Sequence, residues 1–532
     1  MRAEHHRYRG SGRLPRSERW RIERLTEANP LWGSNGIAFG PDGRLYVAQY
    51  VAGRISAVDL GSGDVEVVVD LDGPVQSPDD LAFGADGSMY ITDLTPGRVW
   101  RRTPDGAFTL VSDEVAAPNG IACVGDRVFV NEMRVGGRVL EVTPGAEPVV
   151  LAEGLAMGNA MQLGPDGCLY YPHMITGEVH RVSPDGGEPE LVAEDVHAPV
   201  AVRFDRGGSL TVLSRGEEGI VTRIDLFGSG DRSVVPGEVS GMDNAAFDAE
   251  NRMFVSSFAA GGIAELSPDG RAREVVPTGL VGPFGVAAHR SGTVFAGDNY
   301  RLADVDDGQV TTRELLVFSH GVATDDRGRV HLTSQFGDVR TYEPDDRVLT
   351  TRARELSRPT GVAARRDGSL VVAETGRGRV VTIAEDDALD VLAEDLDSPV
   401  DVAVDGQDRC YVSDERAGTV SLVDGCGIAL VAEGLEAPQG IAVLDGELFV
   451  VETGRRRLLA IDLATGERRV EARDLAVGLP PGTARAQPAL FQHGLPGVPV
   501  PFAGVAAGAD GSLYISANGE GSVLHLRRRS RE

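Results

Sequence analysis

Lysine is missing from this chain. All 52 basic residues in its 532 positions are arginine, which excludes Schiff-base chemistry and lysine nucleophiles. Only four cysteines occur, Cys123, Cys168, Cys410 and Cys426, and none lies at a metal-binding or CxxC spacing. We therefore expect buried thiols rather than disulfides or a cysteine-based metal site.

Long apolar runs are also missing. The chain has no apolar stretch of about 18 residues, and its charged N-terminus, MRAEHHRYRGSGRLPRSERW, lacks the apolar core of a secretory signal. These absences predict a cytoplasmic protein that does not bind a membrane. The net charge of −28 repels nucleic acid and anionic lipid, so we expect a small molecule as the binding partner. The sequence does not indicate an oligomeric state.

The chain instead contains a repeat of about 40 residues. Each unit has a short apolar run, a PDG or ADG turn and an alternating strand, as in NGIAFGPDGRLYVAQ from Asn35, and two further strands follow. Four short strands per unit predict the blades of an all-β propeller fold. The units begin at Asn35, Asp79, Asn119, Asn159, Val200, Asp243, Phe284, His320, Thr360, Val400, Gln439 and Ala503.

Twelve such units predict two tandem six-bladed β-propellers with four-stranded antiparallel blades. Two strand-like segments remain, WRIERLTE near the N-terminus and REVVPTGL at residues 273–280. If the first completes blade six and the second completes blade twelve, each ring closes on its own ends. This predicts a disordered basic tail at residues 1–19, a first propeller at 20–271 and a second at 272–532.

A Pro-rich insertion at about residues 475–502 lengthens the last repeat. Its composition predicts a loop. It could be a lid or docking surface, or a plain connector packed between the two rings. The second ring is accordingly expected to stabilise the first or to cover its mouth.

The residues that open the innermost strands differ between the two halves. In the first half five of six carry side-chain oxygens, whereas the second half has Phe, Val and Thr at the same backbone position, so turn chemistry alone does not demand Asn or Asp. Carboxylate and amide oxygens suit a hard divalent cation. We predict one such ion, with Ca²⁺ expected first and Mg²⁺, Mn²⁺ and Zn²⁺ as alternatives. Its predicted ligands are Asp79, Asn159, Asp243 and Asn119.

Catalysis at that ion requires a base. The ion would polarise a carbonyl and acidify a water, and whichever of Asp243 and Asp79 is less committed to the ion would take the proton. Asn119 and Asn35 are expected to contact substrate. His173 stands among the residues that end the second strands, and it is either a ligand, base or proton shuttle or a structural histidine. The acids at the other positions of that column occur in both halves, so we expect them to bind backbone groups.

Three segments carry a family resemblance. APNGIACVGDRVFVNE from Ala117, GNAMQLGPDGCLYYPHM from Gly158 and SGMDNAAFDAENRMFVSS from Ser240 resemble the SMP-30/gluconolactonase/LRE family, and the repeats resemble NHL units. The resemblance implies six-bladed propellers with one divalent ion at the channel mouth that hydrolyse lactones or related esters.

The match to that family is incomplete at the acids. Asn119 and Asn159 occupy the family's two Asn positions, but Asn35 stands where the family has Glu and Val200 where it has the metal-binding Asp. Asp79 and Asp243 supply two carboxylates with the same four-blade separation, turned by one blade around the ring.

Together these features predict a divalent-metal-dependent hydrolase of a lactone or ester-like small molecule. One alternative keeps the metal but makes the protein an isomerase, lyase or cyclase of a small-molecule metabolite. Another is a non-catalytic binding scaffold, in which removal of the metal would leave partner binding intact. The sequence contains no GxSxG or HExxH motif, so serine-hydrolase and zincin mechanisms have no support.

Overall fold

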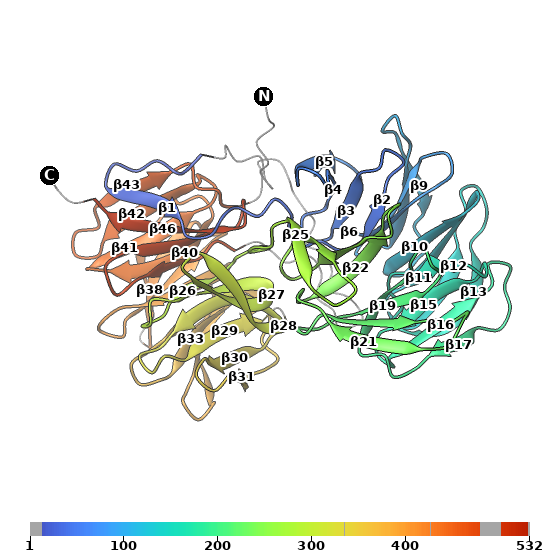
Figure 1. Ribbon diagram of the computed structural model, residues 1–532. Coiled ribbons are helices and arrows are strands. Elements are labelled where there is room, and N and C mark those ends of the chain that lie inside the picture. Colours follow the sequence, from blue (N-terminus) through green and yellow to red (C-terminus); the bar gives the residue numbers. More distant parts are fainter. Residues whose placement is uncertain (1–12, 335, 426, 479–501, 530–532) are drawn as a thin grey trace. The chain divides into compact units, whose positions relative to one another are not determined.

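The computed structural model describes residues 13–334, 336–425, 427–478 and 502–529. These residues form 46 strands and a single 3₁₀ turn, Thr375–Arg377. None of their helical structure is long and apolar enough to cross a bilayer. Apart from β1 (Trp20–Arg24), which pairs with β46 (Ser522–Arg528), the strands pair with their neighbours in the chain, and they form antiparallel sheets of four and one sheet of six. The predicted all-β fold of two tandem propellers is confirmed (Figure 1).

The first propeller is a compact unit at residues 31–278 with six four-stranded blades. Its second strands are buried along their whole length, as LYVAQ in blade one shows, because each is covered by the neighbouring blades. Apolar clusters fill the spaces between blades, and each buried Val or Leu contributes about 1.5–3 kcal/mol. Blade by blade, the strands are β2 (Ile37–Phe39), β3 (Leu45–Gln49), β4 (Arg54–Val58), β5 (Val65–Val69); β6 (Pro78–Phe83), β7 (Met89–Asp93), β8 (Arg98–Arg102), β9 (Phe108–Ser112); β10 (Pro118–Val124), β11 (Arg127–Glu132), β12 (Val135–Glu141), β13 (Val149–Ala156); β14 (Gln162–Leu163), β15 (Leu169–His173), β16 (Glu178–Val182), β17 (Glu190–Ala193); β18 (Pro199–Phe204), β19 (Leu210–Ser214), β20 (Ile220–Ile224), β21 (Arg232–Pro236); and β22 (Met242–Phe247), β23 (Met253–Ser257), β24 (Ile263–Leu266), β25 (Ala272–Val276).

The second propeller is discontinuous in sequence, and its described parts are residues 13–30, 279–478 and 502–529. Its strands are β26 (Val286–Ala288), β27 (Val294–Asp306), β28 (Gln309–Thr324), β29 (Val330–Ser334), β30 (Val339–Glu343), β31 (Val348–Ala353); β32 (Pro359–Ala364), β33 (Leu370–Glu374), β34 (Arg379–Ile383), β35 (Leu389–Ala393); β36 (Pro399–Val404), β37 (Cys410–Asp414), β38 (Thr419–Asp424), β39 (Gly427–Ala432); β40 (Pro438–Leu444), β41 (Glu447–Glu452), β42 (Arg457–Asp462), β43 (Arg468–Arg473); and β44 (Val505–Ala507), β45 (Leu513–Ala517), β46 (Ser522–Arg528), β1 (Trp20–Arg24).

The two strand-like segments outside the repeats, WRIERLTE and REVVPTGL, each complete the blade that was predicted for the other. β1 pairs with β46, with Trp20 opposite Arg528, and so completes blade twelve. β25 pairs with β24 and completes blade six. β24 and β25 are joined by one short turn, so their pairing costs far less loop-closure entropy than recruitment of a distant N-terminal strand. A boundary at residue 271 would therefore remove β25 from the first propeller, and the structure places the division after residue 278.

Trp20 packs the N-terminal strand β1 against the second propeller. Its indole is 1% exposed, its Nε1 donates to Glu471 Oε2 at 2.8 Å, and its ring meets Phe449 edge-on at 5.9 Å between centroids. Just before this strand, the backbone amide of Arg16 donates to the carbonyl of Arg473 at 3.0 Å. The predicted disordered tail is thus wrong at Pro15, which is buried, and at Arg16, which is paired with Arg473, and residues 1–12 lie outside the described part of the chain.

Blade seven departs from the four-strand pattern. β28 first pairs with β27 and then, beyond a bend, with β29, so that blades seven and eight share one six-stranded sheet. Leu316 and Phe318 have positive φ values of 62° and 50° at this bend. The step from Phe284 to His320 is the shortest of the eleven steps between successive units, and it leaves no room for a separate fourth strand.

The acids that end the second strands bind backbone amides, as predicted. Asp93 accepts from the amide of Ser77 at 2.7 Å, and in the second propeller Asp298 accepts from Val281 and Gly282, both at 2.8 Å. These carboxylates fix the segment that leads into each blade, in both propellers, and they are structural.

The cysteines and the Pro-rich insertion are only partly described. Cys410 is buried, Cys123 and Cys168 are half-buried, and all three are free thiols; Cys426 lies outside the described residues. Of the insertion predicted at about residues 475–502, the structure describes residues 475–478 and 502. The predictions of a lid or a connector therefore fall outside the described residues.

Candidate active site at the mouth of the first propeller

The residues that open the innermost strands of the first propeller lie around one channel. Neighbouring blades are joined at this level by hydrogen bonds: the Gly36 amide donates to the Asp79 carbonyl at 2.7 Å and the Ala160 amide to the Val200 carbonyl at 3.2 Å. Only glycine fits at position 36, because a Cβ there would lie 2.4 Å from Asp80 Oδ1. This close approach sets neighbouring blades side by side at the level of the column. All six residues of the column are buried: Asn35, Asp79, Asn119, Asn159, Val200 and Asp243.

Asp79 and Asp243 form an electrostatically coupled pair of buried carboxyls. Burial raises the pKa of Asp79 well above its ordinary value, and the charges of Asp243 and Asp80 raise it further. Burial likewise raises the pKa of Asp243 to about 7, while Arg215 acts in the opposite direction. Two such groups cannot both ionise at low cost unless a proton or a cation lies between them.

Asn119 joins this pair and has a spare oxygen. Its Nδ2 donates to Asp79 Oδ1 at 2.8 Å, whereas its buried Oδ1 has no hydrogen-bond partner among the described residues. An unpartnered buried carbonyl oxygen beside two carboxyls is the donor set that a divalent cation requires. The residues present therefore fit the predicted ion.

Asn159 and Asn35 lie in the same ring but are bound differently. Asn159 Oδ1 accepts from the amide of Ala160 at 2.7 Å, and its Nδ2 faces Met174 Sδ at 3.1 Å. Asn35 Oδ1 accepts from the amide of Tyr50 at 3.4 Å. Of the four predicted ligands, Asn119 therefore contacts Asp79, and the charge of Asp243 acts on Asp79. Asn159 instead faces Met174, in the turn between β15 and β16.

A charged network lies one residue deeper in the channel, and sequence reasoning missed it. Asn244 Nδ2 donates to Asp80 Oδ1 at 3.1 Å, and the buried guanidinium of Arg203 lies 3.8 Å from Asp80 Oδ2. Arg203 also donates to the carbonyl of Ala245 at 2.8 Å. The Asp-Asp and Asp-Asn doublets that open blades two and six were the available signal. This network holds blades two, five and six in register beneath the pair.

Arg215 is a second residue that sequence reasoning missed. It follows the second strand of blade five, its charge acts on both Asp79 and Asp243, and its guanidinium lies 4.9 Å from the centroid of the Phe258 ring. A cation stacked on an aromatic ring next to two acids can stabilise a developing negative charge on a substrate.

An apolar rim borders the mouth on blades three and four. Met133 Sδ lies 3.2 Å from Asn119 Nδ2, Val135 pairs with Ala156, and the Ile175 amide donates to the Ala156 carbonyl at 3.2 Å. Val135 and Ile175 are 67% and 59% exposed, more than any other large hydrophobic residue that the structure describes. We call Met133, Val135, Met157, Met174 and Ile175 the methionine rim.

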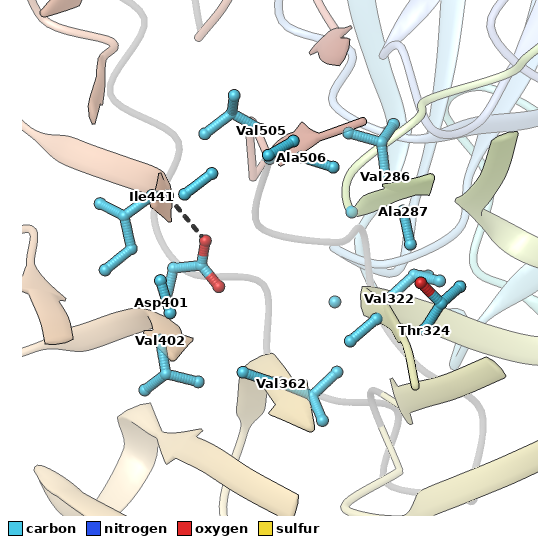
Figure 2. A pocket seen from close by; sticks show the side chains of 18 of the residues that line it. Val286, Ala287, Val322, Thr324, Val362, Asp401, Val402, Ile441, Val505 and Ala506 are labelled. Atoms are coloured by element: carbon cyan, nitrogen blue, oxygen red, sulfur yellow. Dashed lines mark hydrogen bonds between the residues drawn. The ribbon is translucent and has the colours of Figure 1, made fainter. Parts of the chain in front are cut away.

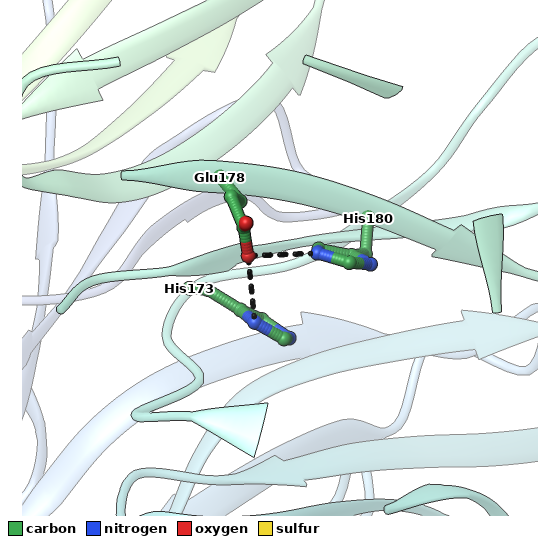
Figure 3. A group of neighbouring side chains, drawn as sticks. All are labelled: His173, Glu178 and His180. Carbon is green, nitrogen blue, oxygen red and sulfur yellow. Dashed lines mark hydrogen bonds and ion pairs between the residues drawn. The ribbon is translucent and has the colours of Figure 1, made fainter. Parts of the chain in front are cut away.

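His173 is not among the groups that act on the acid pair. It lies on blade four beside Glu178 and His180 (Figure 3), with its Nδ1 3.6 Å from Glu178 Oε2 and its ring stacked on that of His180 at 4.2 Å. Burial lowers the pKa of His173 to about 4, the charge of His180 lowers it further, and Glu178 opposes both. The side-chain contacts of His173 among the described residues are therefore with Glu178, His180 and Tyr171 rather than with Asp79 or Asp243.

The channel of the second propeller has no counterpart of this mouth among its described residues. It contains a cavity of about 210 Å³ lined by small apolar residues and by Asp401 (Figure 2). Asp401 Oδ2 accepts from the amide of Ile441 at 2.8 Å. Burial raises the pKa of Asp401 to about 8. Its position matches that of Asp80, because each abuts a glycine of the preceding blade, Gly361 and Gly36 respectively.

Comparison with known proteins identifies the family. Residues 20–303, which span the first propeller, match the model of the virginiamycin B lyase family. The chain belongs to this family. The resemblance to SMP-30 and NHL proteins is shown only at the level of the β-propeller fold, and no curated protein matches the chain.

Solved propellers are similar to parts of this family member at low identity. A streptogramin B lyase structure is 16% identical over 60% of this chain and 95% of that one, with a TM-score of 0.34. The calcium-binding protein regucalcin from Agrobacterium tumefaciens strain C58 is 20% identical over 44% of this chain and 85% of its own, with a TM-score of 0.36. A nidogen/laminin complex is 19% identical, covering 42% and 89%, with a TM-score of 0.38.

Proposed function

We propose that the mouth of the first propeller is the active site of a cation-dependent lyase that opens an ester or lactone bond in a small molecule. The observation that carries this proposal is the buried pair Asp79 and Asp243 with the unpartnered Oδ1 of Asn119 beside it. Family membership supports lyase chemistry over the hydrolysis predicted from sequence.

The chain's own residues supply the remaining parts of such a reaction. Asp79 and Asn119 would hold the divalent ion, whose contribution when bound is to polarise the substrate carbonyl. Asp243 would remove a proton from the carbon that lies between that carbonyl, which is not the ester carbonyl itself, and the carbon that bears the ester oxygen. The electron pair then forms a carbon–carbon double bond as the ester C–O bond breaks, and the carboxylate leaves near Arg215. No water is consumed.

The methionine rim limits the substrates that fit. Val135 and Ile175 are exposed and Met157 and Met174 are half-buried, while Met133 is buried, and methionine adapts to irregular apolar groups. We therefore propose a substrate with an apolar substituent next to the ester rather than a sugar lactone.

Products in ¹⁸O-labelled water distinguish the proposed lyase from the second candidate, a lactone or ester hydrolase. A lyase gives an unsaturated product without ¹⁸O, whereas a hydrolase incorporates one labelled oxygen and forms an alcohol. Incorporation of ¹⁸O would contradict the lyase assignment. Turnover that survives both exhaustive chelation and an Asp79→Asn/Asp243→Asn double substitution would contradict the site itself.

The metal requirement can be measured without a substrate. Elemental analysis after dialysis should find a divalent ion in the wild type and less in the double variant. Asp401→Asn is the matched control, because it removes a buried channel carboxyl from the second propeller and should leave the metal content unchanged.

A further inference from the structure

Three side chains on blade four converge away from the acid pair. β15 and β16 are antiparallel, with His173 opposite Glu178 and Tyr171 opposite His180, so these side chains share one face of the blade. His180 Nε2 lies 3.1 Å from Glu178 Oε2, and His173 Nδ1 lies 3.6 Å from the same oxygen. One ligand atom from each residue lies within 4.8 Å of the other two.

These separations suit a small transition-metal ion. Metal–nitrogen and metal–oxygen bonds of about 2.0–2.2 Å place tetrahedral ligands roughly 3.3 Å apart, and the two measured distances lie on either side of that value. The rings of His173 and His180 are stacked with 17° between their planes, so the partly exposed His180 ring has to turn out of this stack for both nitrogens to meet at one ion. Thr176 Oγ1 donates to Glu178 Oε2 at 2.8 Å, which orients the carboxylate as a supporting hydrogen bond does in metal sites.

His173 needs a partner that the described residues do not supply. Its side chain is 11% exposed, its buried Nε2 has no hydrogen-bond partner among them, and its Nδ1 is 3.6 Å from the carboxylate. His331 shows the ordinary case, since it is fully buried and its nitrogens lie 2.9 Å from Thr341 Oγ1 and 3.3 Å from Asp325 Oδ2. Leaving a buried polar group unpaired is unfavourable, and an ion bound at Nδ1 would give that nitrogen the close partner that Glu178 does not.

We propose that His173, Glu178 and His180 bind one ion of the zinc class, with a position left open for water (Figure 3). Two imidazoles and one carboxylate favour such ions over Ca²⁺ and Mg²⁺, which prefer oxygen ligands. The site is therefore chemically distinct from the oxygen donors at the channel mouth.

The ion would fix a turn that borders the mouth. The ion would bind His173 at the end of β15 together with Glu178 at the start of β16. The turn between these strands contains Met174, whose sulfur lies 3.1 Å from Asn159 Nδ2. Metal binding at this cluster should therefore stabilise blade four and hold one side of the methionine rim in place.

The chain offers a matched control for this cluster. His525 is also buried with an unpartnered Nε2 among the described residues, and its Nδ1 lies 3.7 Å from Glu23 Oε1. Its ring stacks on Tyr514 rather than on a second histidine. His525→Gln therefore removes a comparable buried imidazole without removing a ligand set.

The test uses the full chain without an affinity tag, with His5 and His6 replaced by serine in every protein so that this adjacent pair does not compete for metal. After treatment with EDTA and dialysis, Zn²⁺ is titrated in competition with a chromophoric chelator, and Tm is recorded with and without Zn²⁺. The variants are His180→Gln, Glu178→Gln, His525→Gln and Asp79→Asn/Asp243→Asn. Co²⁺ absorption reports whether nitrogen ligands are bound.

We expect one tight Zn²⁺ equivalent and a higher Tm with Zn²⁺ in the parent, in His525→Gln and in the double Asp variant. His180→Gln and Glu178→Gln should weaken Zn²⁺ at least about tenfold and abolish the rise in Tm. Equal Zn²⁺ affinity in all proteins, or loss only in the double Asp variant, would overturn the proposal. The double Asp variant tests the channel mouth separately. A negative result for the His173, Glu178 and His180 site therefore leaves the proposed lyase intact, and a negative result for the lyase leaves this site intact.

Discussion

The two propellers are made from the same repeat, yet they differ in whether the polar groups at their channels have hydrogen-bond partners. In the second propeller these groups satisfy one another: Thr360 bonds Thr375 at 2.8 Å, and Gln439 Oε1 accepts from the amide of Ala503 at 2.9 Å. In the first propeller Asn119 Oδ1 has no partner among the described residues, and two buried carboxyls repel each other. Unsatisfied groups that persist in a well-packed scaffold indicate a ligand site.

The largest effect should come from removing the acids of one ring only. Asp79→Asn/Asp243→Asn should reduce turnover by about a thousandfold or more, since a general base alone contributes about 10²–10⁴. Asp401→Asn, which removes the buried carboxyl of the other channel, should retain wild-type kcat/KM. Steady-state kinetics with the product assay measure both, and equal losses in the two variants would show that the rings do not differ in function.

The N-terminal strand allows the second ring to be weakened selectively. Trp20→Ala removes a buried indole, its contact with Phe449 and its hydrogen bond to Glu471, and should cost about 3–5 kcal/mol of unfolding free energy. Urea unfolding should show this loss, while metal binding by the first propeller in native buffer stays unchanged. Trp20→Phe keeps most of the packing and should cost clearly less.

The sequence predicted the fold well because the repeat is strong. Hairpin turns and alternating strands recur from Asn35 to Ala503, and each blade forms from adjacent segments. The closing strands were assigned to the wrong rings because WRIERLTE and REVVPTGL have the same edge-strand pattern. The choice between them depends on loop closure and on the pocket for Trp20, neither of which a strand pattern contains.

The site was predictable where it depended on the column of opening residues. Asp79, Asn119 and Asp243 come from that column, and the structure brings them together. Arg215 and Arg203 were missed because each lies outside the opening position and reaches the acids from blade five. His173 was singled out as the only histidine of its column, but its neighbours Glu178 and His180 lie on the third strand of its own blade, which the column comparison did not include.

The pH dependence of stability should separate the rings by their response to a cation. The folded-state pKa of Asp243 is about 7, above its ordinary 3.8, so the folded protein holds an extra proton and metal-free stability falls as pH rises from about 4 to about 7. The slope is at most about 1.4 kcal/mol per pH unit. The pKa of Asp401 is about 8, so its contribution to stability also falls as pH rises, up to about pH 8.

Chemical denaturation at pH 5 and pH 8 tests this difference. A saturating divalent ion should remove the contributions of both Asp79 and Asp243, whereas Asp243→Asn should remove only that of Asp243 and Asp401→Asn only that of Asp401. A cation that also flattened the dependence left in Asp79→Asn/Asp243→Asn would mean that the ion acts elsewhere.

The smallest effect should come from the methionine rim, which tests whether the first mouth recognises apolar groups. Val135→Ser and Ile175→Ser each remove methyl groups worth about 0.8 kcal/mol per buried carbon, so together they should raise KM for an apolar ester about tenfold. Leu430→Ser in the second propeller is the control, because Leu430 is 58% exposed and Ile175 is 59% exposed. Unfolding free energies should stay close to wild type in all three variants, since the side chains already face solvent. If KM rises equally for a small polar ester, the rim acts on the shape of the mouth rather than on an apolar substituent, and the substrate class would have to be widened.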